Sequence, residues 1–328
     1  MSSTQRTHAV QPQLGLDQGN RIEGSLGHDY TELAKHLSGL TGRVVLVPNP
    51  GNAGDCIICT GSYHVFRHVG LNPEIGDWRE TYPDAHVIYD GGGNMIPHYR
   101  QAWTSLKSHI GNCRSFTLMP HTTRGGEDVL SRLDERFTLF ARERKTFQHL
   151  SEYATGATVR LSHDMAFAND IRNLDRLEKD MPVFRNAPFG SGSWRRQARS
   201  QMYWMARQSR NRWRGEKFPS NTSLNAFRMD QERSGAVPLP KDNIDVSDHL
   251  AFPQDSSPFI GLKIARKFVS HLDRYETIRT DRLHVAITGI LLGKKVEAWD
   301  NSYGKLFDVL SHSLPKQVDD VLVDKVNK

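Results

Sequence analysis

Short apolar runs alternate with stretches of helical periodicity through the first half of the chain. The apolar runs predict strands at Val44–Val47, His86–Tyr89, Phe116–Met119, Phe137–Ala141 and Thr158–Leu161. The periodic stretches predict helices at Tyr30–Leu40, Cys56–Val69, Glu127–Leu133 and Lys145–Tyr153. Strands separated by helices of this length are typical of βαβ units, so we expect a mostly parallel sheet with right-handed crossovers.

The pattern dissolves after Asp164–Phe167 and resumes as a second, smaller α/β unit. This unit has predicted helices at Leu262–Leu272 and Leu283–Leu292 and predicted strands at Glu276–Arg279 and Val296–Trp299. A chain of 328 residues exceeds the size at which a single core usually stops growing, so two domains are expected. We predict a loose segment over residues 1–28, an N-terminal α/β domain over 29–175, a linker over 176–225 and a C-terminal α/β domain over 226–328.

Composition places the chain among ordinary globular proteins, with 37% hydrophobic and 24% charged residues. No apolar stretch approaches the roughly 18 residues that span a bilayer, and the first residues lack the apolar core of a signal peptide, so we expect a cytoplasmic protein. Cys56 and Cys59 have redox spacing, but their apolar helical context favours a buried structural pair. No Cys/His set has convincing zinc spacing, and neither a metal nor a cofactor is expected.

The net charge of +6 is concentrated in Trp194–Lys217, which holds eight basic residues and one acidic residue. Arginine and tryptophan together suit an anionic membrane surface or a lipid-diphosphate acceptor. Such binding would place the protein peripherally on the inner face of the cytoplasmic membrane. A solvated linker is the competing interpretation. Nucleic acid is not expected as a partner, because the segment belongs to no recognisable binding fold.

Four polar loops follow predicted strands, at the carboxyl ends where open α/β sheets bind ligands. In the first loop, Asn52, Gly54 and Asp55 suit a turn that aims backbone amides at an anion or a hydroxyl. Asp55 as the N-cap of the following helix is an equally good interpretation.

The second loop is a glycine triplet and the third follows Pro120, which closes a predicted strand. The triplet segment consists of Gly91, Gly92, Gly93 and Asn94. A dinucleotide-binding G-x-G-x-x-G pattern would need glycine at Ile96, so the triplet indicates either close approach to another substrate or a tight turn. The third loop offers His121 and Arg124, residue types that are more often solvated or structural.

The fourth loop, Thr280–His284, carries most of the functional argument. Asp281 follows a predicted strand and is the expected N-cap, with Arg282 and His284 in the first helical turn. Free backbone N–H groups and the positive end of the helix dipole gather there and favour a neutral, proton-accepting imidazole. Arg282 can bind a carboxylate or phosphate in a forked geometry. A capped structural helix with a surface histidine is the alternative.

In their order along the chain these loops resemble the polysaccharide pyruvyl transferase family. The matching segments are Asn52–Asp55, Gly91–Asn94, Pro120–Thr122, Arg142–Glu143, Asp164–Phe167, Arg228–Glu232, Thr280–His284 and Asp300–Lys305. The most specific match is T-D-R-L-H followed by D-N-x-Y-x-K. The resemblance implies two Rossmann-like domains in the GT-B glycosyltransferase architecture, with the active site in the interdomain cleft. It also implies transfer of pyruvate from phosphoenolpyruvate to two hydroxyls of a sugar, with release of phosphate.

Under this resemblance the C-terminal domain would hold phosphoenolpyruvate and the N-terminal domain the acceptor, a sugar or lipid-linked oligosaccharide. His284 is the candidate acid/base, next to Asp281 and Arg282. The candidate donor-binding residues are Arg228, Arg282, Asn301, Tyr303 and Lys305. The candidate acceptor-binding residues are Asn52, Gly54, Asp55, Gly91, Gly92, Gly93, Asn94 and His121. Two rivals are a GT-B-like glycosyltransferase that uses a sugar nucleotide and a non-catalytic subunit of a polysaccharide assembly complex.

Overall fold

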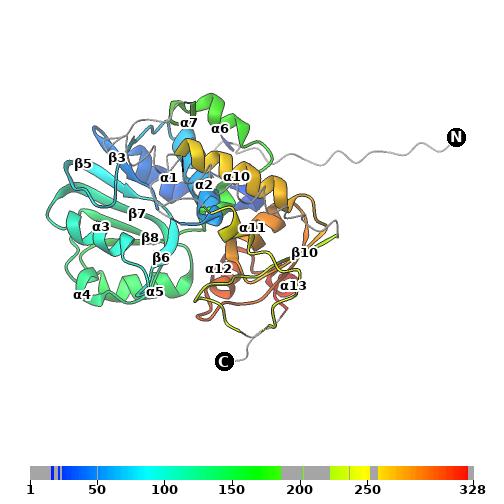
Figure 1. Cartoon of the computed structure of the whole chain (residues 1–328). Coiled ribbons are helices and arrows are strands. Elements are labelled where there is room, and N and C mark those ends of the chain that lie inside the picture. The colour runs from blue at the N-terminus through cyan, green and yellow to red at the C-terminus, as the bar shows by residue number, and fades with distance from the viewer. Residues whose placement is uncertain are drawn as a thin grey trace.

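Two parallel sheets dominate the fold, one of seven strands and one of three (Figure 1). The computed structural model describes residues 16–17, 21–22, 24–49, 51–185, 202, 222–235, 237–251 and 258–323. We call residues 24–185 the large lobe and residues 222–323 the small lobe. Ahead of them, β1 (Leu16–Asp17) and β2 (Arg21–Ile22) pair antiparallel. The predicted α/β class with parallel sheets is confirmed.

The large sheet has the strand order β4-β3-β5-β7-β8-β9, and β6 pairs with β7 beyond the end of β5. Its strands are β3 (Val44–Val47), β4 (Glu74–Ile75), β5 (Tyr82–Tyr89), β6 (Gly92–Met95), β7 (Cys113–Thr123), β8 (Phe137–Ala141) and β9 (Thr158–Leu161). The chain changes direction across the sheet at β3, because β4 lies on one side and β5 and all later strands lie on the other. Ligands of open parallel sheets bind at such a switch point, beyond the carboxyl ends of the strands.

Two predicted loops of the large sheet are partly strand. The glycine triplet enters β6, and Pro120 does not end its strand, since β7 continues to Thr123. The pairing of β7 with β8 is irregular between Leu118 and His121, which accommodates a proline that cannot donate to a ladder. The expectation that His121 lies in a loop was therefore wrong. The residue is fully buried in the centre of the sheet.

Helices cover both faces of the large sheet because side chains alternate along each strand. Val44 and Leu46 pack on one face with α1 and α2, whereas Val45 and Val47 pack on the other with α3, α4 and α5. The helices of this lobe are η1 (Ser25–Gly27), α1 (Thr31–Ser38), α2 (Ala53–His68), α3 (Gln101–His109), α4 (Glu127–Leu130), α5 (Arg144–Tyr153), η2 (Met165–Ala168), α6 (Asp175–Asp180) and α7 (Pro182–Arg185).

The small sheet has the order β10-β11-β12, with all pairs parallel. Its strands are β10 (Ser223–Ala226), β11 (Thr277–Thr280) and β12 (Lys295–Ala298). Its helices are α9 (Val246–His249), α10 (Pro258–Leu272), α11 (Leu283–Leu291), α12 (Lys305–Ser313) and α13 (Val318–Val321). The register aligns Ala226, Thr280 and Ala298, so the three strands end at one edge.

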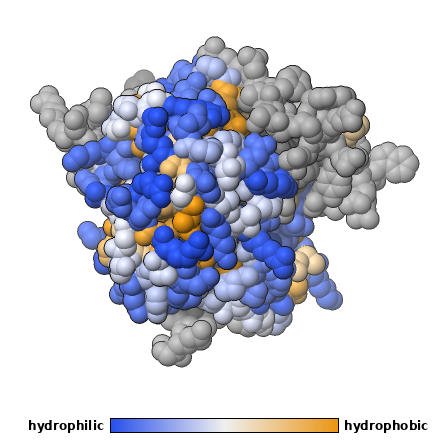
Figure 2. All heavy atoms as spheres, turned by 90° about the vertical axis from the view of Figure 1, so that its left-hand side faces the viewer, coloured by the Kyte–Doolittle hydropathy of each residue, from blue (hydrophilic) through white to orange (hydrophobic). Residues whose placement is uncertain are grey.

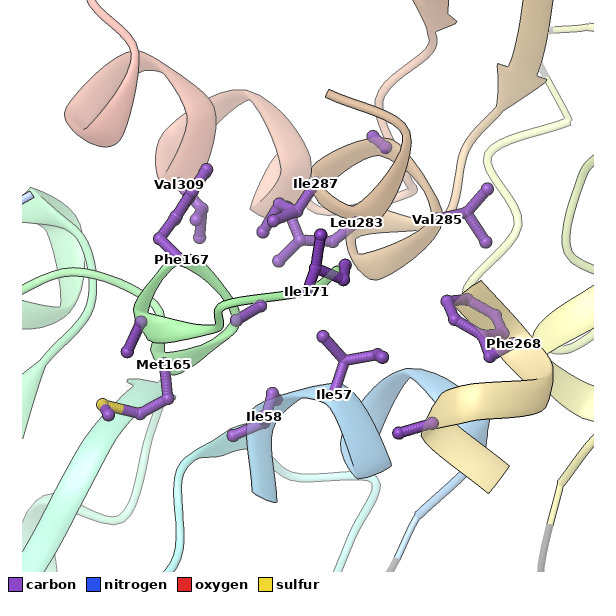
Figure 3. Packing of buried hydrophobic residues seen from close by; sticks show 14 of the residues in the cluster. Ile57, Ile58, Met165, Phe167, Ile171, Phe268, Leu283, Val285, Ile287 and Val309 are labelled. Atoms are coloured by element: carbon purple, nitrogen blue, oxygen red, sulfur yellow. The ribbon is translucent and has the colours of Figure 1, made fainter. Parts of the chain in front are cut away.

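One continuous apolar core joins the lobes (Figure 3). Ile57 of α2 faces Phe268 of α10 and Leu283 of α11, and Phe167 of η2 lies next to Val309 in the same cluster. Burial of each such side chain stabilises the fold by about 1.5–3 kcal/mol. Within the large lobe, the backbone of η2 lies so close to Gly61 of α2 that an added Cβ would collide with it, which fixes these two contributors to the shared core. The lobes are thus held together by apolar packing as well as by polar contacts.

Several predictions concern the ends and the surface of the chain. Within the predicted loose segment, His28 is buried and its Nε2 lies 2.9 Å from the carbonyl oxygen of Ser313.

The basic stretch Trp194–Lys217 lies outside the described residues, apart from Met202, and the domain limits stay predictions. Among the helices that the structure describes, none combines the length and apolarity needed to cross a bilayer. The face drawn in Figure 2 is mainly hydrophilic, with a narrow apolar strip near its centre.

The two cysteines of α2 are half-buried rather than fully buried, and both are free thiols. Burial raises the pKa of the Cys56 and Cys59 thiols well above their usual range, and nearby carboxylates add to the effect. A protonated thiol is a poor nucleophile and a poor metal ligand. No group of three or more His, Cys, Asp or Glu side chains in the described ranges has the geometry of a metal site.

Candidate active site

The carboxyl ends of the two sheets meet at the junction of the lobes. Strand register places Gly92 of β6, His121 of β7 and Ala141 of β8 side by side in the large sheet. The segments that follow these positions, and those that follow the aligned ends of the small sheet, supply the polar side chains of one region. The most specific predicted motif, Thr280–His284, lies in that region.

His284 and Arg142 are linked by Asp164. Nη1 of Arg142 donates to Oδ2 of Asp164 over 2.6 Å, and Nε of Arg142 donates to Thr122 over 2.8 Å. Nε2 of His284 lies 3.5 Å from the same Oδ2. That separation is long for a hydrogen bond, and Nε2 has no hydrogen-bond partner among the described residues. Asp164 therefore holds Arg142 and faces His284.

Asp164 stays ionised although it is fully buried. Burial alone would raise the pKa of its carboxyl group, but the Arg142 guanidinium and the neighbouring His284 hold the pKa well below its usual range. Asp164 also caps η2, since its Oδ1 accepts from the backbone N–H of Ala166 over 2.8 Å. The carboxylate is thus fixed from both sides, and its orientation toward His284 is set by the fold.

The start of α2 packs against His284. Asn52 is the N-cap and Asp55 stands at the third helical position. The two form a capping box, in which the Asn52 side chain accepts from a backbone N–H of the first turn and the Asp55 side chain accepts from the backbone N–H of Asn52. The interpretation of Asp55 as N-cap was therefore wrong by three residues. Oδ2 of Asp55 accepts from the Asn52 N–H over 2.7 Å, and Oδ1 of Asn52 accepts from Gly54 over 2.8 Å. The cap groups serve the helix, and Gly54 is the residue that meets His284.

Replacing Gly54 with alanine tests the close contact between Gly54 and His284. A Cβ there would lie 2.8 Å from Cβ and from Nδ1 of His284, closer than real Cβ atoms come. We expect Gly54→Ala to displace the imidazole and to destabilise the protein by about 1–3 kcal/mol through overpacking. Gly39→Ala is the control, because its Cβ would be 3.4 Å from the nearest atom. Urea unfolding should separate the two variants, and equal behaviour would contradict the tight contact.

A hydrogen-bonded network orders the glycine triplet at the switch point. Asn49 donates to the Gly91 carbonyl over 3.0 Å, and Asn94 donates to Asn49 over 2.6 Å. Nε2 of His121 lies 2.9 Å from Oδ1 of Asn94. Burial, with Arg142 adding to it, lowers the pKa of His121 to about 3, so the imidazole is neutral. Asp90 accepts from Gly91 N over 2.8 Å and fixes the turn.

Gly93 makes room for two cations. A Cβ on Gly93 would collide with Nη2 of Arg142 and would lie 3.5 Å from Cδ of Lys305. This Nη2 is buried and has no hydrogen-bond partner among the described residues. Arg142 therefore directs an unused donor toward the triplet from within the protein. Gly91 and Gly92 lie beside it, against Ile58 and His121 respectively.

Arg282 and Asp281 depart from their predicted places. The N-cap of α11 is Arg282, with no side-chain capping bond, and only His284 of the motif's charged residues lies in the first turn. Asp281 fails as N-cap because its Oδ1 accepts instead from the backbone N–H of Arg228, over 2.7 Å. Arg282 is paired through Nη2 with Asp245 and with Asp230, the latter over 3.1 Å.

Four predicted donor-binding residues converge on Glu232, a residue given no role in the sequence. Nη1 of Arg228 lies 2.8 Å from Oε2 of Glu232, and Nζ of Lys305 donates to Oε2 over 2.9 Å. Tyr303 donates to it over 3.0 Å, and Asn301 over 3.4 Å. Arg228 is also bound through Nε and Nη2 to Asp230. Arg228 and Arg282 are thus largely neutralised by the protein's own carboxylates.

The structure brings thirteen of the predicted residues into one polar region and leaves the cap pair Asn52 and Asp55 with helix-capping roles. Three further residues lie in its centre: Arg142, Asp164 and Glu232. Each belongs to a motif segment noted in the sequence. The signal that could have found Arg142 is a charged residue directly after a buried strand, and for Asp164 it is a charge ahead of an apolar segment. Glu232 lies among other polar residues and has no such local signal.

A sequence profile of the polysaccharide pyruvyl transferases matches residues 52–296, and the chain belongs to this family. It is 25% identical over 311 residues to the Bacillus subtilis (strain 168) protein named "Putative pyruvyl transferase EpsO", covering 85% of this chain and 89% of that protein. Its fold is similar to the crystal structure of a functionally uncharacterised protein from Klebsiella pneumoniae subsp. pneumoniae NTUH-K2044. That likeness has a TM-score of 0.66 and 25% identity, and covers 90% of this chain and 97% of the other. The protein is a transferase of the pyruvyl transferase class.

Proposed function

We propose that the protein transfers pyruvate from phosphoenolpyruvate to two hydroxyls of a sugar in a polysaccharide precursor, forming a cyclic ketal. The observation that carries this proposal is the group formed by His284, Asp164 and Arg142 beside Gly93 and Lys305. It combines a proton-transfer side chain with cations suited to a carboxylate and a phosphate. The arrangement of the lobes as a GT-B enzyme with a cleft between them belongs to the same proposal.

Arg142 and Lys305 are the donor-binding residues that the geometry favours. Nη2 of Arg142 is an unused, buried N–H donor next to the triplet, whereas the predicted clamps Arg228 and Arg282 are already paired with carboxylates. Burial lowers the pKa of Lys305 to about 8, although Glu232 opposes the change, so the amine is largely protonated at neutral pH. Arg282 keeps a buried Nε without a partner among the described residues and adds a second donor nearby.

The chemistry requires one group that gives a proton and later accepts one. His284 gives a proton to the methylene carbon of phosphoenolpyruvate, and a sugar hydroxyl attacks the adjacent carbon and returns its proton to the imidazole. Phosphate then leaves with the C–O bonding pair, and the second hydroxyl attacks the resulting cation and loses its proton to the released phosphate. The Asp164 carboxylate, 3.5 Å from Nε2, would stabilise the imidazolium.

The acceptor would lie on the large-lobe side, against the glycine triplet and the Asn94–His121 pair. These groups are ordered by the network at the switch point and are mostly neutral, which suits sugar hydroxyls better than an anion. A lipid-linked precursor as acceptor, and binding of a membrane surface by Trp194–Lys217, remain part of the proposal. Co-sedimentation with anionic vesicles tests the membrane part, and absence of binding at every salt concentration would contradict it.

Ligand-induced stabilisation separates this function from its rivals. We expect phosphoenolpyruvate at a hundredfold excess over its dissociation constant to stabilise the protein by about 2.7 kcal/mol. Pyruvate with inorganic phosphate, which lacks the enol ester, and a nucleoside diphosphate sugar are the comparison ligands. Thermal unfolding measures all three. A response to the sugar nucleotide alone would overturn the proposal in favour of glycosyl transfer, and no response to any would favour a non-catalytic subunit.

A further inference from the structure

Glu232 is a buried carboxylate, 5% exposed, with donors from both lobes. Lys305 and Arg228 of the small lobe reach its Oε2 over 2.9 Å and 2.8 Å. Tyr99, which lies between β6 and α3 of the large lobe, donates to its Oε1 over 2.7 Å. Burial would raise the pKa of Glu232, but Lys305 and Arg228 hold it below its usual range, so the carboxylate stays charged.

Lys305 depends on this carboxylate for its charge. Burial, with Arg228 and Arg142 as like-charged neighbours, lowers the pKa of Lys305, and Glu232 is the group that raises it. The other titratable groups that face the ammonium are Tyr303, whose ring lies 5.2 Å away, and His121, which is neutral. Neither supplies a negative charge. Without the Glu232 carboxylate, a buried amine between two guanidiniums would lose its proton at lower pH.

An ammonium group has three N–H donors, and Glu232 uses one of them on Lys305. The remaining two can bind an anion while the carboxylate stays in place. Arg228 is committed more fully, because Nε and Nη2 donate to Asp230 and Nη1 pairs with Glu232. Glu232 therefore holds two cations at fixed positions and leaves Lys305 able to bind a ligand.

We propose that Glu232 is a positioning residue for pyruvyl transfer, whose carboxylate holds the Lys305 ammonium beside the donor and joins it to Tyr99 of the large lobe. The inference rests on the proposed function in one respect, that the ligand beside Lys305 is the anionic donor. Glu232 does not contact the reacting atoms. Glu232 contributes by keeping Lys305 protonated and by fixing the position of its ammonium group.

The test measures the affinity of phosphoenolpyruvate by isothermal titration calorimetry between about pH 6 and pH 10, a range that spans the lysine titration. In the wild-type chain we expect affinity to fall as pH rises through the pKa of Lys305. In Glu232→Gln the fall should begin about one pH unit lower, with affinity largely recovered at the acid end of the range. In Lys305→Arg the fall should disappear, since guanidinium stays protonated.

Glu297→Gln is the matched control, because Glu297 is a small-lobe carboxylate that pairs with Arg279 on β11 and with Lys295. It should leave the pH profile unchanged. Glu232→Asp, whose side chain is one methylene shorter, should lower the pH at which affinity falls by a smaller amount. It replaces Glu232→Gln in the test if that variant does not fold. An unshifted profile, or an equal loss of affinity at every pH, would overturn the inference alone. Absence of phosphoenolpyruvate binding by the wild-type chain would overturn it together with the proposed function.

Discussion

Replacing Asp164 with alanine is expected to destabilise the protein by about 3–5 kcal/mol, because it leaves a buried guanidinium without its counter-charge. Arg142 has no exposed side-chain surface, and Asp164 is its partner at 2.6 Å. The carboxyl pKa of Asp164 is depressed in the folded state, so its contribution is present above the unfolded-state pKa of about 3.9. The contribution is lost as pH falls from there toward the lower folded value. Urea unfolding at neutral and acid pH measures both effects.

Asp134→Ala is the control for that experiment. Asp134 pairs with Arg136 over 2.5 Å, but both side chains are about one-third exposed. Exposed ion pairs contribute about 0–1 kcal/mol, so this variant should unfold almost like the wild type. Equal losses in the two variants would show that burial does not determine the cost. A small loss in Asp164→Ala would mean that Arg142 reaches solvent or another anion.

Replacing His284 with glutamine is expected to lower the rate of phosphate release from phosphoenolpyruvate by about 10²–10⁴-fold, the usual contribution of a general acid–base. The amide keeps polarity near the position of Nε2 but cannot carry the transferred proton. Steady-state assays with a panel of hexosides that carry neighbouring free hydroxyls measure the rate. Affinity for phosphoenolpyruvate should change little, because Arg142 and Lys305 remain.

His68→Gln is the matched control for the histidine experiment. His68 ends the same helix whose first turn meets His284, roughly 22 Å along the helix axis at 1.5 Å per residue. Its replacement should leave the rate unchanged. Near-normal turnover by His284→Gln would remove His284 from the proton-transfer role. Loss of donor affinity in that variant would instead indicate a binding role.

Elements with strong local signals were predictable from sequence. The apolar runs Val44–Val47, Phe137–Ala141 and Thr158–Leu161 form strands with the predicted bounds. Errors arise where a partner distant in sequence overrides a local preference. Pro120 stays in β7 because neighbouring strands hold it on both sides. Asp281 accepts a hydrogen bond from the backbone of Arg228, 53 residues earlier, so it does not cap α11, and the N-cap Arg282 makes no side-chain capping bond.

The centre of the active site was harder to predict than its edges. Thr280–His284 is recognisable in the sequence because four of its five residues are polar, whereas Arg142 is a single charge after an apolar strand. Nothing local shows that such an arginine is fully buried and bound to Asp164, because burial depends on the packing of β8, β9 and η2. Glu232 likewise has charged neighbours in sequence, and its five donors come from segments that only the fold brings together, four of them in loops and Lys305 at the start of α12.

The apolar core that Ile57, Phe268 and Leu283 share limits how relatives of this protein can exchange parts. The first turn of helix α2 holds Gly54 beside His284, and the helix continues into that core, so its position along its own axis is set by the small lobe as well as the large one. A chimera that joins the large lobe of one relative to the small lobe of another would bring together two faces that did not evolve against each other. Such a recombinant would need α2, α10 and α11 transferred as one unit, so that His284 keeps its position against the first turn of α2.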